Sequence, residues 1–336
     1  IEEIKVSVIG AGAWGTTIAN LIADKGNNVT LWVHSKKTLD EIKNENENTF
    51  YLPGIKLNDK IQPTSSIKQA LEDKNTIFIA VPSKYLIGLI PEICKNISEN
   101  SFVISLIKGM MLTQPQELIL DYLYRSFVRI PKENYFVLSG PNFAYEIARK
   151  LPAATVIGGS NLEYLSILQA FLSTEYFRVY TNTDAIGIQL GGVLKNIIAI
   201  SAGICDGLEL GSNTKSSLIV RGINEMKKIF VSMGGNTDTL YGLSGLGDLI
   251  GTCTSDLSRN RWAGIQIAKG HSIEEIVETR KITVEGISSL SAVMEMAKKL
   301  NVELPICNEV YEIVHNKKNV KKSIKDLMLR DLKKEF

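Results

Sequence analysis

The chain has 336 residues, of which 44% are hydrophobic and 22% are charged. Its 38 lysines and arginines are balanced by 36 acids, and the net charge of +2 argues against a basic nucleic-acid-binding surface and against an acidic tail. We therefore expect two domains of roughly 100 to 200 residues each and a small-molecule partner.

The cysteines and the apolar segments indicate the cellular setting. The four cysteines lie at 94, 205, 253 and 307 with no closely spaced pair, and the three histidines show no metal-binding spacing with them. This pattern predicts reduced thiols, no zinc site and a cytoplasmic location. The longest apolar region, 186–204, contains Gln189, Lys195 and Asn196 and is a poor membrane span. The chain enters a strand at once, which leaves no room for a signal peptide.

The first predicted elements form a strand–helix–strand unit. Residues 4–9 are a β-branched apolar run, and residues 16–25 repeat apolar side chains at helical spacing before Gly26, a candidate C-cap. A second apolar run follows at 29–34. This order predicts a βαβ unit.

Later apolar runs extend this pattern into a sheet. They predict strands at 76–81, 102–107 and 135–138, and two further strands at 154–159 and 177–182. Near-continuous apolar strands that alternate with helices indicate a parallel sheet covered on both faces. From Asp184 onward, helical periodicity takes over.

The predicted fold is therefore α/β. A doubly wound, mostly parallel Rossmann sheet is expected over residues 1–184, followed by an all-helical domain over residues 185–336. The lysine- and asparagine-rich patches at 43–48 and 316–325 are expected to be solvated surface.

The stretch VIGAGAWG, residues 8–15, joins the first strand to the first helix through Gly10, Gly12 and Gly15. In a G-x-G-x-x-G pattern the glycines permit a tight turn, close approach of the backbone to a pyrophosphate, and tight packing of the helix on the strand. Backbone N–H groups at the helix start then hold the phosphates. An ordinary strand-to-helix turn is the alternative, but the surrounding βαβ unit favours a dinucleotide.

The end of the second strand bears on the choice of dinucleotide. Sites specific for NAD(H) usually place an acid there to bind the ribose 2′-hydroxyl. Here the residues are Val33, His34, Ser35, Lys36 and Lys37. The missing acid and the nearby positive charge favour NADP(H) over NAD(H), unless the lysines are simply solvated.

Lys195 lies in GGVLKNIIAISAG, on a helix face that it shares with small residues. An ammonium group there cannot easily reach bulk water, and desolvation would lower its pKa, which suits a proton donor near neutral pH. The alternative is a lysine whose stem crosses a buried helix to reach solvent.

Lys108 stands at the end of a predicted strand, immediately before Gly109. Ligands of open α/β sheets bind at the carboxyl ends of strands, so a cation there is well placed over a substrate. The segment SGPNFA, residues 139–144, ends the next strand with Gly-Pro at a helix start. Ordinary loop punctuation is the alternative for both segments.

Residues 242–261 are rich in glycine and polar side chains. Asp248 lies in a glycine-dense turn, and Ser258 can cap a helix that begins with Arg259 and Asn260. A cap, a guanidinium and an amide at one helix start form an anion site suited to phosphate. The alternative is a surface helix with Arg261 as a second exposed charge.

Together these segments resemble the NAD(P)-dependent glycerol-3-phosphate dehydrogenases of the bacterial type. The similar segments are GAGAWGT, LWVHS, AVPS at 80–83, IKG at 107–109, SGPNFAYEIA, IGIQLGGVLKNIIAISAGICDGL, GLGDLIGTCTSDLSRNR and VEG at 284–286. The resemblance implies reversible hydride transfer between NAD(P)H and dihydroxyacetone phosphate, giving sn-glycerol 3-phosphate for glycerophospholipid synthesis. It also implies a homodimer, for which glycine-rich helices at 187–203 and 222–235 offer small faces.

By position, the resemblance implies roles for individual residues. Lys195 matches the general acid and base, with Lys108 and Asp248 as further catalytic residues. The substrate-contacting positions are Lys108, Gly140, Asn142, Lys195, Asp248, Ser258, Arg259 and Asn260. The cofactor-contacting positions are Gly10, Gly12, Ala13, Trp14, Gly15, His34, Pro82, Lys108, Ala144, Arg259, Thr283 and Glu285. Two of them depart from the family pattern, since Asn142 is often Ser or Thr and Thr283 is often aliphatic.

Two other functions remain open from the sequence. A dehydrogenase of similar architecture could act on a 3-hydroxy acid, but a carboxylate substrate needs no phosphate site at Ser258, Arg259 and Asn260. A redox-sensing module could hold NAD(P)H without turnover, which would leave Lys108, Lys195 and Asp248 unexplained.

Overall fold

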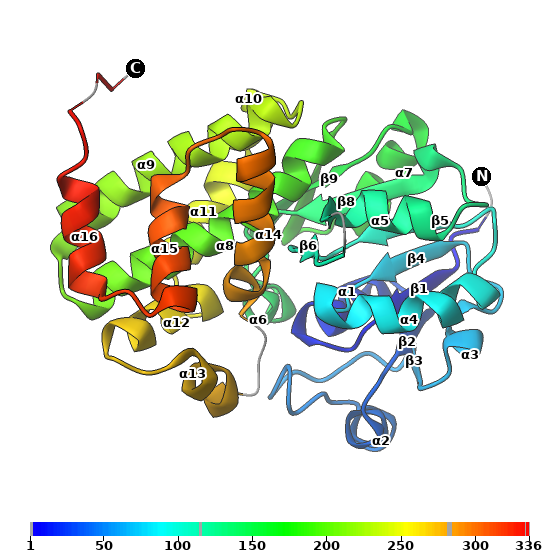
Figure 1. Ribbon diagram of the computed structural model, residues 1–336. Coiled ribbons are helices and arrows are strands. Elements are labelled where there is room, and N and C mark those ends of the chain that lie inside the picture. Colours follow the sequence, from blue (N-terminus) through cyan, green and yellow to red (C-terminus); the bar gives the residue numbers. More distant parts are fainter. Residues whose placement is uncertain (1–2, 114–115, 281–283, 333, 336) are drawn as a thin grey trace. The chain divides into compact units, whose positions relative to one another are not determined.

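The computed structural model describes residues 3–113, 116–280, 284–332 and 334–335, and it divides into two compact units, Ile1–Gln189 and Leu190–Phe336 (Figure 1). The division falls inside the long helix α8 (Ala185–Gly207), whereas we expect a boundary at residue 184, just before this helix. The first unit carries the main sheet, and the second is built from helices.

An eight-stranded sheet forms the centre of the first unit, in the order β10-β9-β8-β5-β4-β1-β2-β3. Its strands are β1 (Val6–Ile9), β2 (Val29–Trp32), β3 (Ile61–Thr64), β4 (Thr76–Ile79), β5 (Phe102–Ser105), β8 (Tyr135–Ser139), β9 (Ala153–Gly158) and β10 (Phe177–Asn182). All neighbouring strands run parallel except β8 and β9, which are antiparallel. The mostly parallel, doubly wound sheet predicted from the alternating elements is confirmed.

Helices connect these strands and pack along the sheet (Figure 1). They are α1 (Ala13–Asp24), α2 (Lys36–Glu45), α3 (Ile67–Leu71), α4 (Ser83–Asn96), α5 (Ile119–Ser126), α6 (Ala144–Ala148) and α7 (Leu162–Leu172), with a short 3₁₀ turn, η1 (Lys132–Asn134). Every residue of β1, β2 and β4 is buried, which is why these strands are continuous apolar runs in the sequence. Gly26 follows α1 with φ of +92°, as expected of a glycine that ends a helix.

Three strands are absent from the sequence prediction, the strands predicted at 29–34, 76–81 and 102–107 end two residues earlier, and one helix start differs. β3 is an edge strand that contains Pro63, a residue that edge strands tolerate and that hides the strand from a search for apolar runs. The antiparallel pair β6 (Met110–Met111) and β7 (Glu117–Leu118) is too short to leave a pattern. Helix α1 begins at Ala13 rather than at residue 16, because Gly12 already serves as its N-cap.

Within its described residues the second unit contains helices joined by turns and loops and no strand, which confirms the predicted all-helical domain. After α8 it contains α9 (Gly211–Ser232), α10 (Thr237–Tyr241), a π-helical turn η2 (Leu243–Gly247), α11 (Asp248–Thr254), α12 (Arg259–Ala268), α13 (Ile273–Arg280), α14 (Glu285–Lys299), α15 (Pro305–Asn316) and α16 (Val320–Met328). Helix α8 is long and apolar enough to cross a membrane by length and composition alone, but all of its most apolar window is buried inside the protein.

Glycines let α8 lie close to its neighbours. A Cβ atom on Gly203 would overlap the backbone carbonyl of Arg261 in α12, and one on Gly191 would overlap the carbonyl of Ser244 in η2. Gly222 of α9 likewise faces a side chain of α8. The small faces at Gly191, Gly203 and Gly222 are therefore occupied within the chain, whereas a Cβ atom on Gly234 would meet nothing within 4 Å. The homodimer stays a prediction.

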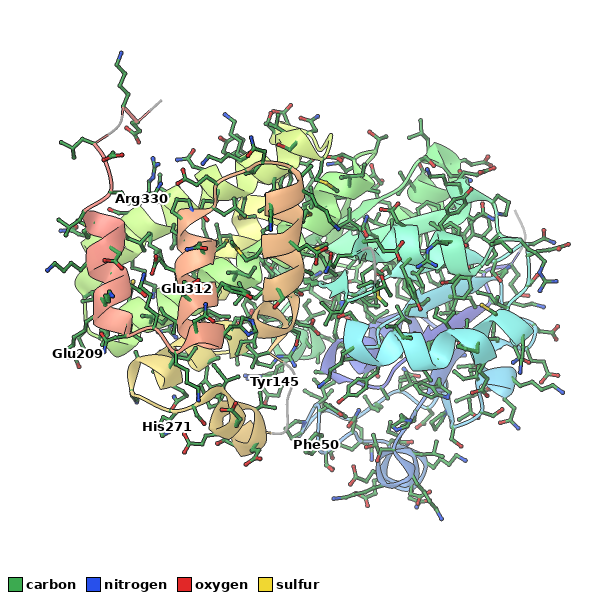
Figure 2. The ribbon with its side chains drawn as sticks, in the orientation of Figure 1. Phe50, Tyr145, Glu209, His271, Glu312 and Arg330 are labelled. Carbon is green, nitrogen blue, oxygen red and sulfur yellow. The ribbon has the colours of Figure 1, made fainter. Side chains whose placement is uncertain are left out.

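The two predicted surface patches differ in burial. Residues 316–325 are mostly exposed, and the charged side chains of Glu209 and Arg330 also lie on the outside of the second unit (Figure 2). In the patch at 43–48, however, Asn48 is fully buried, with 0% of its surface exposed. The prediction of a solvated surface is wrong at this residue, because its side-chain amide donates a hydrogen bond to the glycine-rich turn.

Candidate active site

The glycine-rich turn between β1 and α1 has one open position and two tightly packed ones. Gly10 has φ of +118°, and a Cβ atom there would lie 3.0 Å from the backbone of Ala80. A Cβ atom on Gly15 would overlap the carbonyl of Gly10, whereas one on Gly12 would meet nothing within 4 Å. No side chain caps the start of α1 at Gly12. The turn thus presents open backbone and first-turn N–H groups, which fits a pyrophosphate.

Three further residues predicted to contact the cofactor lie at helix starts in the same unit. Trp14 is in the first turn of α1, and its indole N–H is buried without a hydrogen-bond partner among the described residues. Pro82 is the N-cap of α4. Ala144 begins α6, and its carbonyl oxygen accepts a hydrogen bond from Thr17 Oγ1 of α1 (3.2 Å), which ties α6 to α1.

The segment that follows β2, residues 34–37, is exposed and carries no acid. His34, Ser35, Lys36 and Lys37 are all exposed. The Ser35 hydroxyl accepts a hydrogen bond from the Thr38 N–H (3.3 Å) and caps α2. Lys36 and His34 are therefore presented beside a helix start, the arrangement expected if a 2′-phosphate binds there.

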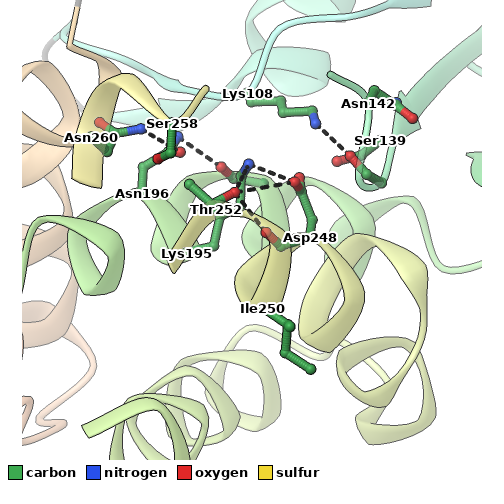
Figure 3. Close-up of polar contacts among 12 residues, drawn as sticks. Lys108, Ser139, Asn142, Lys195, Asn196, Asp248, Ile250, Thr252, Ser258 and Asn260 are labelled. Atoms are coloured by element: carbon green, nitrogen blue, oxygen red, sulfur yellow. Dashed lines mark hydrogen bonds and ion pairs between the residues drawn. The ribbon is translucent and has the colours of Figure 1, made fainter. Parts of the chain in front are cut away.

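Lys108 and the segment after β8 form a connected group in the first unit (Figure 3). Lys108 Nζ donates a hydrogen bond to the carbonyl oxygen of Gly140 (2.6 Å). Asn142 Nδ2 donates to Thr155 Oγ1 (3.0 Å), and that hydroxyl donates to the carbonyl oxygen of Ser139 (2.9 Å). The side-chain oxygen of Asn142 is buried with no partner among the described residues, so this group has an unused acceptor.

In the second unit, α8 and α11 bring Lys195 and Asp248 together (Figure 3). Lys195 Nζ donates to Asp248 Oδ1 (2.7 Å) and to Thr252 Oγ1 (2.8 Å). The side chains of Lys195 and Asp248 are only 7% and 2% exposed. Thr252 Oγ1 in turn donates to the backbone carbonyl of Asp248 (2.6 Å), so the ammonium group is held by two fixed oxygens.

Asn260 connects three helices of the second unit. Its Nδ2 donates to Asn196 Oδ1 of α8 (2.9 Å), and its Oδ1 accepts from the N–H of Gly286 in α14 (2.9 Å). One Nδ2 hydrogen of Asn260 is therefore committed to α8. Glu285, predicted to contact the cofactor, is the first residue of α14, while Thr283 lies outside the described residues.

The two arginines of the SRNR segment differ in their contacts. Ser258 caps α12 as predicted, because its hydroxyl accepts the Arg261 N–H (3.1 Å). Arg259 is exposed at the first helical position. Arg261 is instead bound by its guanidinium to Asp206 and Asp256, with only 15% of its side chain exposed. Arg259 is therefore the guanidinium at this helix start that faces solvent. The alternative interpretation, in which Arg261 is a second exposed charge, is wrong.

The cysteine thiols of α8 and α11 are free and buried. All four cysteines are free, and burial raises the pKa of Cys253, which follows Thr252 on α11, to about 12. Burial also raises the pKa of Cys205 to about 11. These thiols stay protonated near neutral pH and are poor nucleophiles. Within the described residues, no group of His, Cys, Asp and Glu is arranged to hold a metal ion.

Several polar residues of these groups escaped the sequence analysis. Thr252 lies four residues after Asp248 on one helix, a spacing that places both side chains on one face and could have revealed it. Asn196 directly follows Lys195, but its contact with Asn260 spans 64 residues and leaves no local signal. Thr155 lies in a strand and shows no pattern of its own.

Comparison with known proteins identifies the family. Residues 5–165 match the model of the N-terminal part of NAD-dependent glycerol-3-phosphate dehydrogenase, and residues 184–325 match that of its C-terminal part. The NAD(P)+ glycerol-3-phosphate dehydrogenase of Solidesulfovibrio magneticus is 40% identical over 332 residues, covering 99% of this chain and all of that protein.

Solved structures agree with the sequence matches. The crystal structure of glycerol-3-phosphate dehydrogenase from Coxiella burnetii is 34% identical, with a TM-score of 0.93, and covers 98% of this chain and 99% of that chain. The Plasmodium falciparum glycerol-3-phosphate dehydrogenase structure is 27% identical, with a TM-score of 0.89 over 98% and 97% of the two chains. These matches favour a phosphate-substrate dehydrogenase over a 3-hydroxy-acid dehydrogenase and over a binding module without turnover.

The chain therefore belongs to the NAD-dependent glycerol-3-phosphate dehydrogenase family, and it is an oxidoreductase that uses a nicotinamide cofactor.

Proposed function

We propose that this enzyme reduces dihydroxyacetone phosphate to sn-glycerol 3-phosphate with Lys195 as general acid, and that Lys195 acts as general base in the reverse direction. The observation that supports this role is the buried ammonium group of Lys195, held 2.7 Å from Asp248 Oδ1 and 2.8 Å from Thr252 Oγ1. A cation fixed in this way needs little rearrangement as charge develops on a substrate oxygen.

Each step of the reaction assigns a task to the chain's own residues. When bound, the reduced nicotinamide supplies a hydride to the keto carbon. Lys195 stabilises the negative charge that grows on the keto oxygen and gives that oxygen a proton, so that ketone, hydride and proton together form the alcohol. Asp248 keeps the amine in position and bonds a substrate hydroxyl. The neutral amine then regains a proton from solvent.

The phosphate of the substrate requires a second group of residues. We propose that Arg259, with Ser258 and Asn260 at the start of α12, binds this phosphate and that Arg259 also contacts the cofactor. Support comes from the exposed Arg259 guanidinium at a helix N-terminus, where the helix dipole favours an anion. On the first unit, Lys108, Gly140 and Asn142 are proposed to contact the substrate on the strength of the family resemblance.

Lys195→Ala tests the role in proton transfer. We expect kcat to fall by about 10² to 10⁴, the range for loss of a general acid or base, with NADPH binding kept. Steady-state kinetics and a direct NADPH titration measure the two quantities. Lys215→Ala is the matched control, because Lys215 forms an ion pair with Asp206 outside this group, and it should keep a near-normal kcat. A near-normal kcat for Lys195→Ala would show that Lys195 is structural.

Arg259→Ala tests the phosphate site. Loss of a charge-assisted hydrogen bond of about 1.5 to 3 kcal/mol should raise the KM for dihydroxyacetone phosphate by about 10- to 150-fold, with a smaller rise in the KM for NADPH. Inorganic phosphate should stimulate reduction of unphosphorylated dihydroxyacetone by the wild type but not by the variant. Lys269→Ala makes the same charge change at the other end of α12 and serves as control. Equal KM values for Arg259→Ala and wild type would rule out this site.

We also propose that NADP(H) is preferred over NAD(H), which is supported by the exposed His34 and Lys36 and by the lack of an acid after β2. Only NADPH carries the 2′-phosphate, so His34→Ala and Lys36→Ala should each raise the Kd for NADPH more than the Kd for NADH. Parallel titrations of both cofactors measure this. Equal losses would mean that these side chains are solvated surface.

Finally, we propose that the enzyme works in the cytoplasm as a homodimer and supplies sn-glycerol 3-phosphate for glycerophospholipid synthesis. The family resemblance supports all three points, and the free cysteines agree with a reducing compartment. Light scattering at micromolar concentration should report the mass of two chains, and a monomer would contradict the assembly. Cells that lack the enzyme should need added glycerol 3-phosphate, with the activity in the soluble fraction of wild-type cells.

A further inference from the structure

A buried asparagine lies behind the glycine-rich turn. Asn48 is fully buried, although the loop that carries it, residues 46–60, has many exposed side chains. Its side-chain amide donates one hydrogen bond to the carbonyl oxygen of Ala11 (2.9 Å) and one to Thr16 Oγ1 (2.9 Å). Its side-chain oxygen accepts a hydrogen bond from the Tyr51 N–H (3.3 Å). Both donor hydrogens of this amide are thus used on the turn and the start of α1.

The loop is anchored by buried residues and a hydrogen bond that follow Asn48 in the sequence. Leu52 and Leu57 are only 1% and 3% exposed and belong to the core of the first unit. The Asn58 N–H donates to Asn20 Oδ1 of α1 (2.8 Å). Phe50, by contrast, is 55% exposed on the same loop (Figure 2). The loop therefore holds the Asn48 amide against the turn while its neighbours remain in solvent.

The hydrogen bond to Ala11 fixes the direction of the peptide between Ala11 and Gly12. In a planar trans peptide the C=O and N–H groups point to opposite sides. Since the Ala11 carbonyl is turned toward Asn48, the Gly12 N–H points away from Asn48. A flipped peptide would remove this N–H from an anion and would turn the partial negative charge of the carbonyl toward it.

We propose that Asn48 is a positioning residue for the dinucleotide, one that keeps the Ala11 carbonyl turned away from the pyrophosphate and the Gly12 N–H turned toward it. The inference rests on dinucleotide binding at the glycine-rich turn, the site of the function proposed above. Asn48 acts through the backbone of Ala11, so its loss should weaken the binding of cofactor and leave the binding of substrate unchanged.

Direct titration of NADPH with the whole enzyme, followed by cofactor fluorescence, tests this role. Asn48→Ala should raise the Kd for NADPH by about 3- to 10-fold, the effect of one or two neutral hydrogen bonds, while the KM for dihydroxyacetone phosphate stays near normal. Asn48→Asp keeps the shape but replaces the amide donors with a carboxylate that repels both the carbonyl and the phosphates. It should therefore raise the Kd more than Asn48→Ala does.

Two matched variants separate the contacts. Thr16→Val removes one acceptor of Asn48 but keeps its bond to Ala11, so it should raise the Kd less than Asn48→Ala. Thr49→Ala, in the same loop, removes an exposed hydrogen bond to Glu41 of α2 (2.8 Å) and should leave the Kd unchanged. Thermal unfolding of each cofactor-free variant shows whether it is folded, and if Asn48→Asp does not fold, Asn48→Ala and Thr16→Val still decide the question.

Two results would overturn the inference. One is an Asn48→Ala enzyme with a lowered unfolding temperature and a wild-type Kd for NADPH, since Asn48 would then only pack the loop. The other is tighter NADPH binding by Asn48→Asp than by Asn48→Ala, since a packing role makes the isosteric variant the milder one. Failure of the wild type to bind NADPH would instead contradict the proposed function itself.

Discussion

The candidate site of the second unit depends on how closely the backbone of α8 approaches its neighbours. A Cβ atom on Gly203 of α8 or on Gly264 of α12 would overlap backbone atoms of the opposite helix. At this separation Asn196 of α8 reaches Asn260 of α12 across 2.9 Å. The preceding residue of α8, Lys195, is directed at α11 instead. Larger residues at these glycines would separate the helices and the polar groups that meet between them.

This packing buries an ion pair that is hard to explain by stability alone. Lys195 and Asp248 lose most of their hydration, and such buried pairs often stabilise a fold no more than apolar side chains of similar size would. The ion pairs of Asp206 with Lys215 and Arg261 are different, because all three side chains are 15% to 22% exposed to solvent. The Asp206 pairs tie helices together at the surface. The buried pair is understandable as a preorganised charge for the proposed proton transfer.

Local patterns made much of the first unit predictable. The turn at Gly10, Gly12 and Gly15 lies between a strand and a helix that are adjacent in sequence, so the βαβ unit could be read directly. In the second unit, the helix cap at Ser258 was predictable for the same reason, since its hydroxyl and the N–H from which it accepts a hydrogen bond are three residues apart. Pro63 hid an edge strand, because an edge strand needs fewer apolar residues and tolerates a missing donor.

Contacts between distant segments could not be predicted in the same way. The contact between Lys195 and Asp248 spans 53 residues in the sequence, and no local spacing indicates it. Asn48 was placed in a solvated patch because its neighbours in sequence are polar, yet it reaches Ala11 across 37 residues and is buried there. Burial of a polar side chain depends on the partners that the fold supplies, and composition does not show those partners.

The proposed joint action of Lys195 and Asp248 in the chemical step is tested most directly by a double-mutant cycle on kcat. The four enzymes are the wild type, Lys195→Ala, Asp248→Asn and the double variant, each assayed with saturating NADPH and dihydroxyacetone phosphate. If Asp248 acts on the chemistry by holding Lys195, the double variant should have about the same kcat as Lys195→Ala alone. A double variant whose kcat falls by the product of the two single effects would show that the residues act independently and would contradict the proposal.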